Sequence, residues 1–73
     1  MKDEFEIRAM GFGELAQRYN PKATASSARN TLRNWINRNP SLMKELSLSG
    51  YKKGYHTLSP KQVSIIVHHL GPP

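Results

Sequence analysis

The sequence predicts one mainly α-helical domain over residues 1–73, with about four helices, an N-terminal strand and a small β-hairpin. Three observations support this fold class. Apolar residues recur with the period of an α-helix, capping residues, prolines and glycines mark the expected helix ends, and one short N-terminal stretch alternates apolar and polar residues. A chain of 73 residues buries only ~60% of the surface that it exposes when unfolded, so we expect a thin core.

The N-terminal part is expected to form a strand followed by a short helix. Residues 4–9 alternate, and their apolar members share one side: Phe5, Ile7 and Ala9. Gly11 and Gly13 then interrupt the pattern. Residues 13–20 are typical of a helix that ends before Pro21, because the residue preceding a proline is disfavoured in the α region. The expected inward side chains of this helix are Leu15, Ala16 and Tyr19.

Residues 26–38 are predicted to form the second helix, which Thr24 or Ser26 would cap by accepting a hydrogen bond from a free backbone amide. Its apolar residues recur at i, i+4, i+7 and i+8, which places them in one stripe: Ala28, Leu32, Trp35 and Ile36. Because its helical phase lies on this stripe, Trp35 is expected in the core.

A third helix is predicted to start with Asn39 as cap and Pro40 at its first position, and to end at Gly50. Its expected core residues are Leu42, Met43 and Leu46. Residues 51–58 suggest a hairpin whose second arm pairs with the strand at residues 4–9.

The fourth helix is predicted to begin after Ser59, because residues 59–62, Ser-Pro-Lys-Gln, have the form of a capping box. Its apolar residues recur at i, i+3, i+4 and i+7: Val63, Ile66, Val67 and Leu70. Gly71 would end it.

The order strand, short helix, turn, helix, helix, hairpin, helix is that of a small winged helix-turn-helix-like domain. In such folds the second helix of the motif enters the DNA major groove while the first crosses the backbone. The order therefore predicts residues 26–38 as a recognition helix and residues 51–58 as a wing.

The charge distribution agrees with a nucleic-acid partner. The formal net charge is +6, yet residues 1–14 alone are net negative, and residues 15–73 hold nine Lys or Arg against the single acid Glu45. With an isoelectric point near 10.1, this imbalance is the electrostatic footprint of a DNA-binding protein.

The candidate DNA-binding residues of the second helix lie opposite its apolar stripe: Arg29, Asn30, Arg33, Asn34 and Asn37. An Arg guanidinium can donate two hydrogen bonds to guanine, and an Asn amide can match adenine. Lys52 and Lys53, at the expected hairpin tip, would contact phosphate. Three alternatives remain open from the residues alone. The basic face is only solvated, or it binds RNA in place of DNA. The third alternative is a protein-interaction adaptor, in which the basic face meets an acidic protein or the fourth helix supplies an apolar contact surface.

Several functional classes find no support in the sequence. There is no cysteine, no Gly-rich phosphate loop and no His-Glu-x-x-His motif, so we expect neither an enzyme nor a cofactor. The adjacent His68 and His69 point about 100° apart on a helix and are not expected to share a metal. No apolar run approaches the ~20 residues that cross a bilayer, and we expect a cytoplasmic protein without membrane contact.

Four stretches together resemble a known family: EFEIRAMGFGELAQRYNP (residues 4–21), LRNWINRNPSLMKEL (32–46), GY (50–51) and LSPKQVSIIVHHLG (58–71). Their spacing is similar to that of the Bacteroidetes family called domain of unknown function 4248, whose members are small bacterial proteins of about this size. The resemblance covers nearly the whole chain and implies no activity. More loosely, the GELA segment, reader helix and wing resemble MerR-type winged helix-turn-helix domains, whose long dimerisation helix has no counterpart here.

Overall fold

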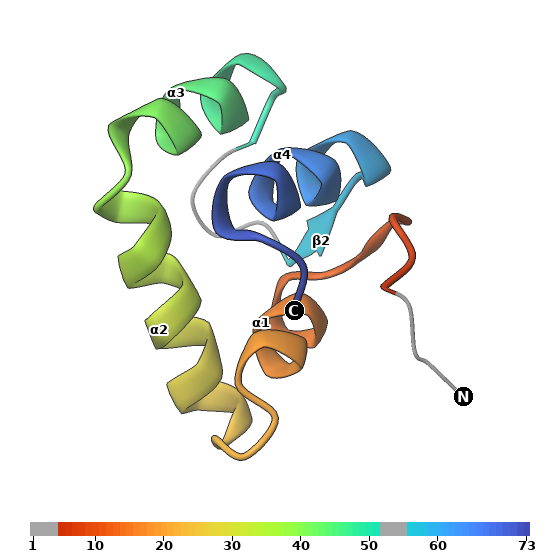
Figure 1. Ribbon diagram of the computed structural model, residues 1–73, viewed down its shortest axis with the longest axis vertical. Helices are drawn as coiled ribbons and strands as arrows, with labels where there is room; N and C mark the ends of the chain where they lie inside the picture. Colours follow the sequence, from red (N-terminus) through yellow and green to blue (C-terminus); the bar gives the residue numbers. More distant parts are fainter. Residues whose placement is uncertain (1–4, 52–55) are drawn as a thin grey trace.

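The computed structural model describes residues 5–51 and 56–73. These residues form, in chain order, β1 (Met10–Gly11), α1 (Phe12–Tyr19), α2 (Ala25–Asn37), α3 (Pro40–Leu48), β2 (Thr57–Leu58) and α4 (Pro60–Leu70). Figure 1 shows α2 along one edge of the molecule, with α1 and α4 on the same side of it and α3 at one end. The predicted class, mainly α-helical with four helices and a small antiparallel sheet, is confirmed for the described residues.

Side chains cap three of the helices at the positions that the sequence predicts. The Thr24 hydroxyl accepts a hydrogen bond from the Ser27 N–H at the start of α2. The Asn39 side chain does the same for Leu42 at the start of α3, where Pro40 occupies the first position. Ser59 and Gln62 form a reciprocal capping box at α4. Each such cap is worth about 1 kcal/mol, so these residues fix where the helices begin.

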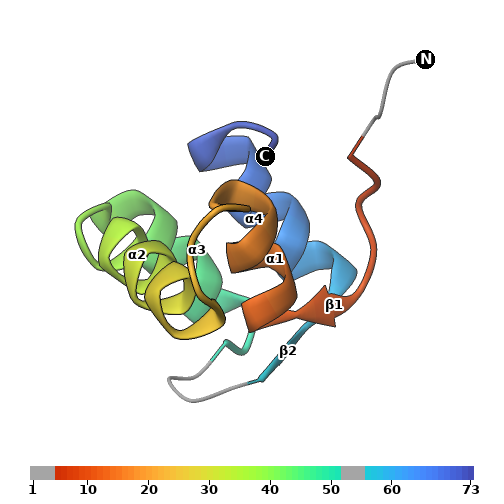
Figure 2. The same ribbon diagram turned by 90° about the horizontal axis from the view of Figure 1, so that it is seen from below.

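The two strands form an antiparallel pair in which Met10 faces Leu58 and Gly11 faces Thr57. Figure 2 shows β1 directly before α1 and β2 beside it. One further hydrogen bond, from the Phe12 N–H to the His56 carbonyl at 2.8 Å, extends the ladder. The segment before the fourth helix thus pairs antiparallel with the N-terminal part of the chain, but its partner is residues 10–11 and not the predicted strand at residues 4–9.

The predicted strand at residues 4–9 is wrong for its described part, since residues 5–9 form no strand. Within this stretch Ala9 is exposed and Ile7 is 42% exposed. The reason is the short length of the partner strand. Because α4 already begins at Pro60, β2 offers only two residues, and these pair with the two residues directly before α1.

One core joins all six elements. Its buried apolar side chains are Met10, Phe12, Leu15, Ala16, Ala28, Leu32, Ile36, Leu42, Leu46, Leu58, Val63 and Ile66. The predicted stripe of α2 thus supplies Ala28, Leu32 and Ile36. The prediction that Trp35 lies in the core is wrong. Trp35 is 36% exposed and lies at the edge of the stripe, where its ring meets the Tyr19 ring edge to face.

No helix within residues 5–51 and 56–73 has the length and apolar character needed to pass through a lipid bilayer.

Candidate nucleic-acid interface

The turn between α1 and α2 holds the candidate recognition helix in place. The Gln17 side-chain amide donates to the backbone carbonyls of Asn20 and Ala23, which ties the turn to α1. Thr24 then caps α2. Because both interactions involve the turn itself, the direction in which α2 leaves α1 is fixed by local hydrogen bonds as well as by the core.

All five predicted α2 residues are exposed: Arg29, Asn30, Arg33, Asn34 and Asn37. At about 100° per residue they form two neighbouring rows, with Arg29, Arg33 and Asn37 in one row and Asn30 and Asn34 in the other. The structure therefore brings the five predicted residues together on one side of α2. Asn30 and Asn34 face away from the buried stripe, whereas Arg29 and Arg33 lie nearer to it, beside α1.

Arg33 is held in place although it is exposed. Its Nη1 donates to Asn30 Oδ1 at 3.0 Å, and its guanidinium carbon lies 5.7 Å from the centroid of the Phe12 ring. Burial raises the pKa of the Tyr51 hydroxyl, and the positive charge of Arg33 acts in the opposite direction, so these two side chains are close enough to interact. A guanidinium held in this way loses less conformational entropy when it binds a ligand.

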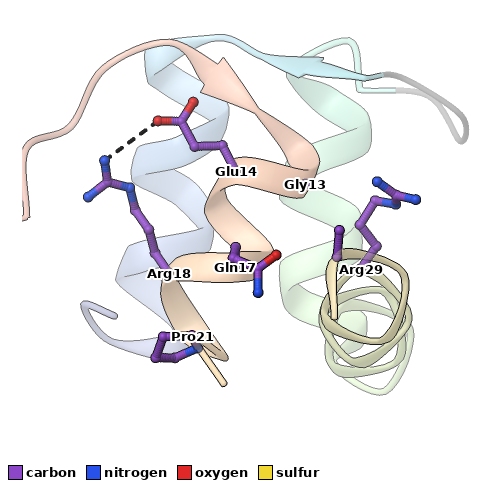
Figure 3. Close-up of a pocket in the computed structure, with 7 residues that line it drawn as sticks. Gly13, Glu14, Gln17, Arg18, Pro21 and Arg29 are labelled. Carbon is purple, nitrogen blue, oxygen red and sulfur yellow. Dashed lines mark ion pairs between the residues drawn. The ribbon is translucent and has the colours of Figure 1, made fainter. Parts of the chain in front are cut away.

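Arg29 lies against the start of α1. A Cβ atom added at Gly13 would come within 3.4 Å of Nη1 and 3.5 Å of Cδ of Arg29, so the missing side chain of Gly13 leaves room for this arginine. Figure 3 shows Arg29 extending from α2 toward Gly13. Within the described residues, Arg29 makes no hydrogen bond and no ion pair, so its charge is available to an external anion.

The acid that lines the same groove as Arg29 is already paired. Glu14 accepts from Arg8 at 3.0 Å and lies 3.5 Å from Arg18. The hydrogen bond from Arg8 is the main reason why the pKa of Glu14 is below its ordinary value. Glu14 therefore stays ionised and engaged with cations of its own, and does not neutralise Arg29.

An open groove separates α1 from the first turn of α2. It is lined by Gly13, Glu14, Gln17, Arg18, Pro21, Ala25 and Arg29. Figure 3 shows Arg18 and Arg29 on opposite sides of it, with the Glu14–Arg18 ion pair marked. Two arginines that flank an open groove can contact an extended polyanion along its length.

The predicted wing lies partly outside the described residues, and Lys52 and Lys53 are among those outside. The described residues on either side are both anchored. The Tyr51 N–H donates to the Leu46 carbonyl, and the His56 carbonyl accepts from Phe12. Residue 51 is close enough to Arg33 for its hydroxyl to respond to the charge, and residue 56 is bonded to Phe12, the residue whose ring Arg33 contacts.

Sequence reasoning missed three exposed basic residues. They are Arg18, which lines the groove beside α1, Arg38, the C-terminal cap of α2, and Lys22, in the turn. Their positive charge was the available signal, but none of them lies in the two rows that the periodicity singled out. Among the described residues, no group of three His, Asp or Glu side chains is arranged to hold a metal ion.

Comparison with known proteins gives one informative result. The family model described as Domain of unknown function (DUF4248) matches residues 6–73, a range that includes every helix and strand of the structure. No curated protein and no solved structure matches the chain.

Proposed function

We propose that this chain, which belongs to the family described as Domain of unknown function (DUF4248), is a non-enzymatic DNA-binding module of the bacterial cytoplasm. In this proposal α2 is the recognition helix, entering the major groove, and residues 51–58 are the wing, with Lys52 and Lys53 on the phosphate backbone. The module has a winged helix-turn-helix-like arrangement. A larger protein partner that it assists is compatible with this function.

The observation that carries the proposal is the exposed row of Arg29 and Arg33 on a helix without acids. Residues 15–44 contain no Asp or Glu at all. An exposed helix face that served only solubility would usually mix acids with bases, since pairs at i and i+4 stabilise a helix. An uncompensated row of positive charge instead suits a polyanion, whose condensed counterions are released when the row binds.

The residue types on this face are also suited to reading bases. An Arg fork can donate two parallel hydrogen bonds to guanine O6 and N7, and an Asn amide can pair with adenine N6 and N7. Asn30 and Asn34 lie opposite the buried stripe, on the outer face of α2 at one edge of the molecule (Figure 1), whereas Arg29 and Arg33 are exposed beside α1. The B-DNA major groove, about 12 Å wide, admits an α-helix of about 10–12 Å diameter.

The test is duplex binding measured by fluorescence anisotropy at several salt concentrations. We expect log affinity to fall steeply with log salt, by about 0.9 for each phosphate neutralised. Arg29→Ala and Arg33→Ala should each weaken binding several-fold. Lys44→Ala is the matched control, since it removes the same charge from an exposed position of α3 and should have a smaller effect.

Two outcomes would count against the proposal. Absence of duplex binding at low salt by a folded protein would favour the alternative, an adaptor whose basic face meets an acidic protein. An equal loss for Lys44→Ala and Arg33→Ala would mean that total charge, and not the α2 face, governs binding.

A further inference from the structure

A second surface lies on the other flank of α2. Tyr19, Trp35, Leu70, Pro72 and Pro73 line an apolar groove between α1, α2 and the chain after α4. On the helical projection, Trp35 flanks the buried stripe of α2 on the side opposite to Arg29 and Arg33. A ligand in this groove would therefore not occupy the arginine row.

The walls of the groove are held together by specific contacts. The Tyr19 and Trp35 rings lie 5.8 Å apart, edge to face. The Tyr19 hydroxyl donates to the Gly71 carbonyl at 2.6 Å, and Gly71 adopts a φ of +87°, which favours glycine. This turn brings Pro72 and Pro73 to the groove. Because prolines and a hydrogen-bonded tyrosine form its sides, the groove is largely preformed.

Trp35 is the residue that a partner would cover. It is 36% exposed and lies in a hollow. Removing the exposed part of a large apolar side chain from water lowers the free energy, so a partner that covers Trp35 is favoured. Trp and Tyr are also the residue types that most often dominate the energy of protein–protein contacts.

Two basic residues neighbour residues that line the groove. Arg38 lies three residues after Trp35 and so neighbours it on the helix surface. Lys22 lines a second depression that shares Tyr19 with the groove. Within the described residues neither cation makes an ion pair or a hydrogen bond through its side chain. A second copy of this chain would present the same positive charges and be repelled, whereas an acidic segment would be attracted.

We propose that the groove between Tyr19 and Trp35 binds an extended acidic segment of a partner protein. One apolar or aromatic side chain of that segment packs against Trp35, and its carboxylates meet Arg38 and Lys22. The walls formed by Leu70, Pro72 and Pro73 favour this occupant over an unstacked nucleic-acid base, because they have no side-chain groups to pair with a base edge.

The experiment uses Trp35 as its own reporter, since it is the only tryptophan in the chain. Random 12-residue peptides are selected by display against the full chain, and the enriched peptides are synthesised and titrated while Trp35 emission is followed. We expect acidic peptides with one conserved apolar or aromatic residue, and a shift of the emission to shorter wavelength as Trp35 is covered.

Charge-matched variants locate the site without disturbing the core. The double variant Lys22→Gln with Arg38→Gln should weaken peptide binding about five- to tenfold, because it removes two exposed ion pairs. The double variant Lys44→Gln with Lys61→Gln carries the same change in net charge and should stay within about twofold of wild type. Arg33→Ala should leave peptide binding unchanged, which separates this proposal from the proposed DNA-binding function.

Several results would overturn the proposal. These are the absence of enriched peptides, the enrichment of peptides without acidic residues, an unchanged Trp35 emission on binding, or an equal effect of the two double variants. If an oligothymidylate, but no peptide, quenches Trp35 and the quenching survives Arg33→Ala, the groove is a stacking surface for bases instead.

Discussion

Replacement of Arg33 by lysine and by alanine tests whether α2 reads bases or only attracts phosphate. Lysine keeps the positive charge but cannot form the planar two-hydrogen-bond contact of a guanidinium. If Arg33 contacts a guanine, Arg33→Lys should lose affinity for a preferred duplex and keep its affinity for random duplex. Arg33→Ala should lose affinity for the preferred duplex as well, and it should also bind random duplex more weakly, with a salt slope lower by about 0.9, if Arg33 contacts a phosphate there.

The structure sets the expected sizes of these effects. In the free protein, Arg33 makes one exposed hydrogen bond to Asn30 and one contact with the face of Phe12. An exposed cation–π contact is worth about 0.5–1 kcal/mol, so Arg33→Ala should lower the free energy of unfolding by about 1 kcal/mol. Loss of a two-hydrogen-bond base contact costs about 1–3 kcal/mol, which is about 5- to 150-fold in affinity.

The assay combines anisotropy titrations with urea unfolding of the same three proteins. A preferred duplex is first enriched from a random pool, and each protein is then titrated with that duplex and with the pool. Equal affinity of Arg33→Lys and wild type for the enriched duplex would refute the base contact. A loss of unfolding free energy well above about 1 kcal/mol in Arg33→Ala would show that the change in binding follows from damage to the fold.

Three further predictions concern stability. Trp35→Ala should lower the unfolding free energy by about 2–3 kcal/mol, because Trp35 is 36% exposed. Leu32→Ala, at a fully buried position, should cost more, in the upper part of the range of about 2–5 kcal/mol for such changes. Denaturant titrations compare the two, and a larger loss for Trp35→Ala would contradict its edge position. Burial raises the pKa of Tyr19 to about 12, so the unfolded chain releases this proton at lower pH than the folded chain does. The free energy of unfolding should therefore decline as pH rises from about 10 toward 12. Tyr19→Phe should reduce that decline, and an unchanged decline would refute the reasoning. The pKa of Glu14 is lowered from its ordinary value of 4.5 mainly by the hydrogen bond from Arg8. The stability that this interaction contributes is therefore present above pH 4.5 and is lost as pH falls through the lower pKa of the folded state. In acid titrations, the free energy of unfolding of Arg8→Ala should decline less than that of wild type.

Helix positions could be predicted from the sequence because their signals are local. Thr24, Asn39 and Ser59 each accept a hydrogen bond from an amide three residues later, and such a bond depends on nothing outside the helix end. The exposed rows of α2 could be predicted for the same reason. Once the buried stripe is known, the 3.6-residue period fixes which residues lie opposite to it.

Features that depend on a distant partner could not be predicted in this way. The alternation of residues 4–9 indicates a strand with one buried and one exposed face, but a strand also needs a neighbour, and β2 offers only two residues for pairing. The period places Trp35 at the edge of the apolar stripe, and only the actual course of α4 and the chain after it decides whether that edge is covered. The contacts of Arg33 with Phe12 and of Arg29 with Gly13 likewise depend on how α1 packs against α2.

The pairing of β1 with β2 also has a consequence for the order of folding. It joins residues 10 and 11 to residues 57 and 58, so α1, α2 and α3 all lie inside one long closed loop. Closing such a loop lowers the entropy of the chain before the contacts between β1 and β2 can stabilise it. In contrast, α1 and α2 are separated by a short turn and can associate early in folding. We therefore expect substitutions in the α1–α2 contact to slow folding, and substitutions at Met10 or Leu58 mainly to speed unfolding.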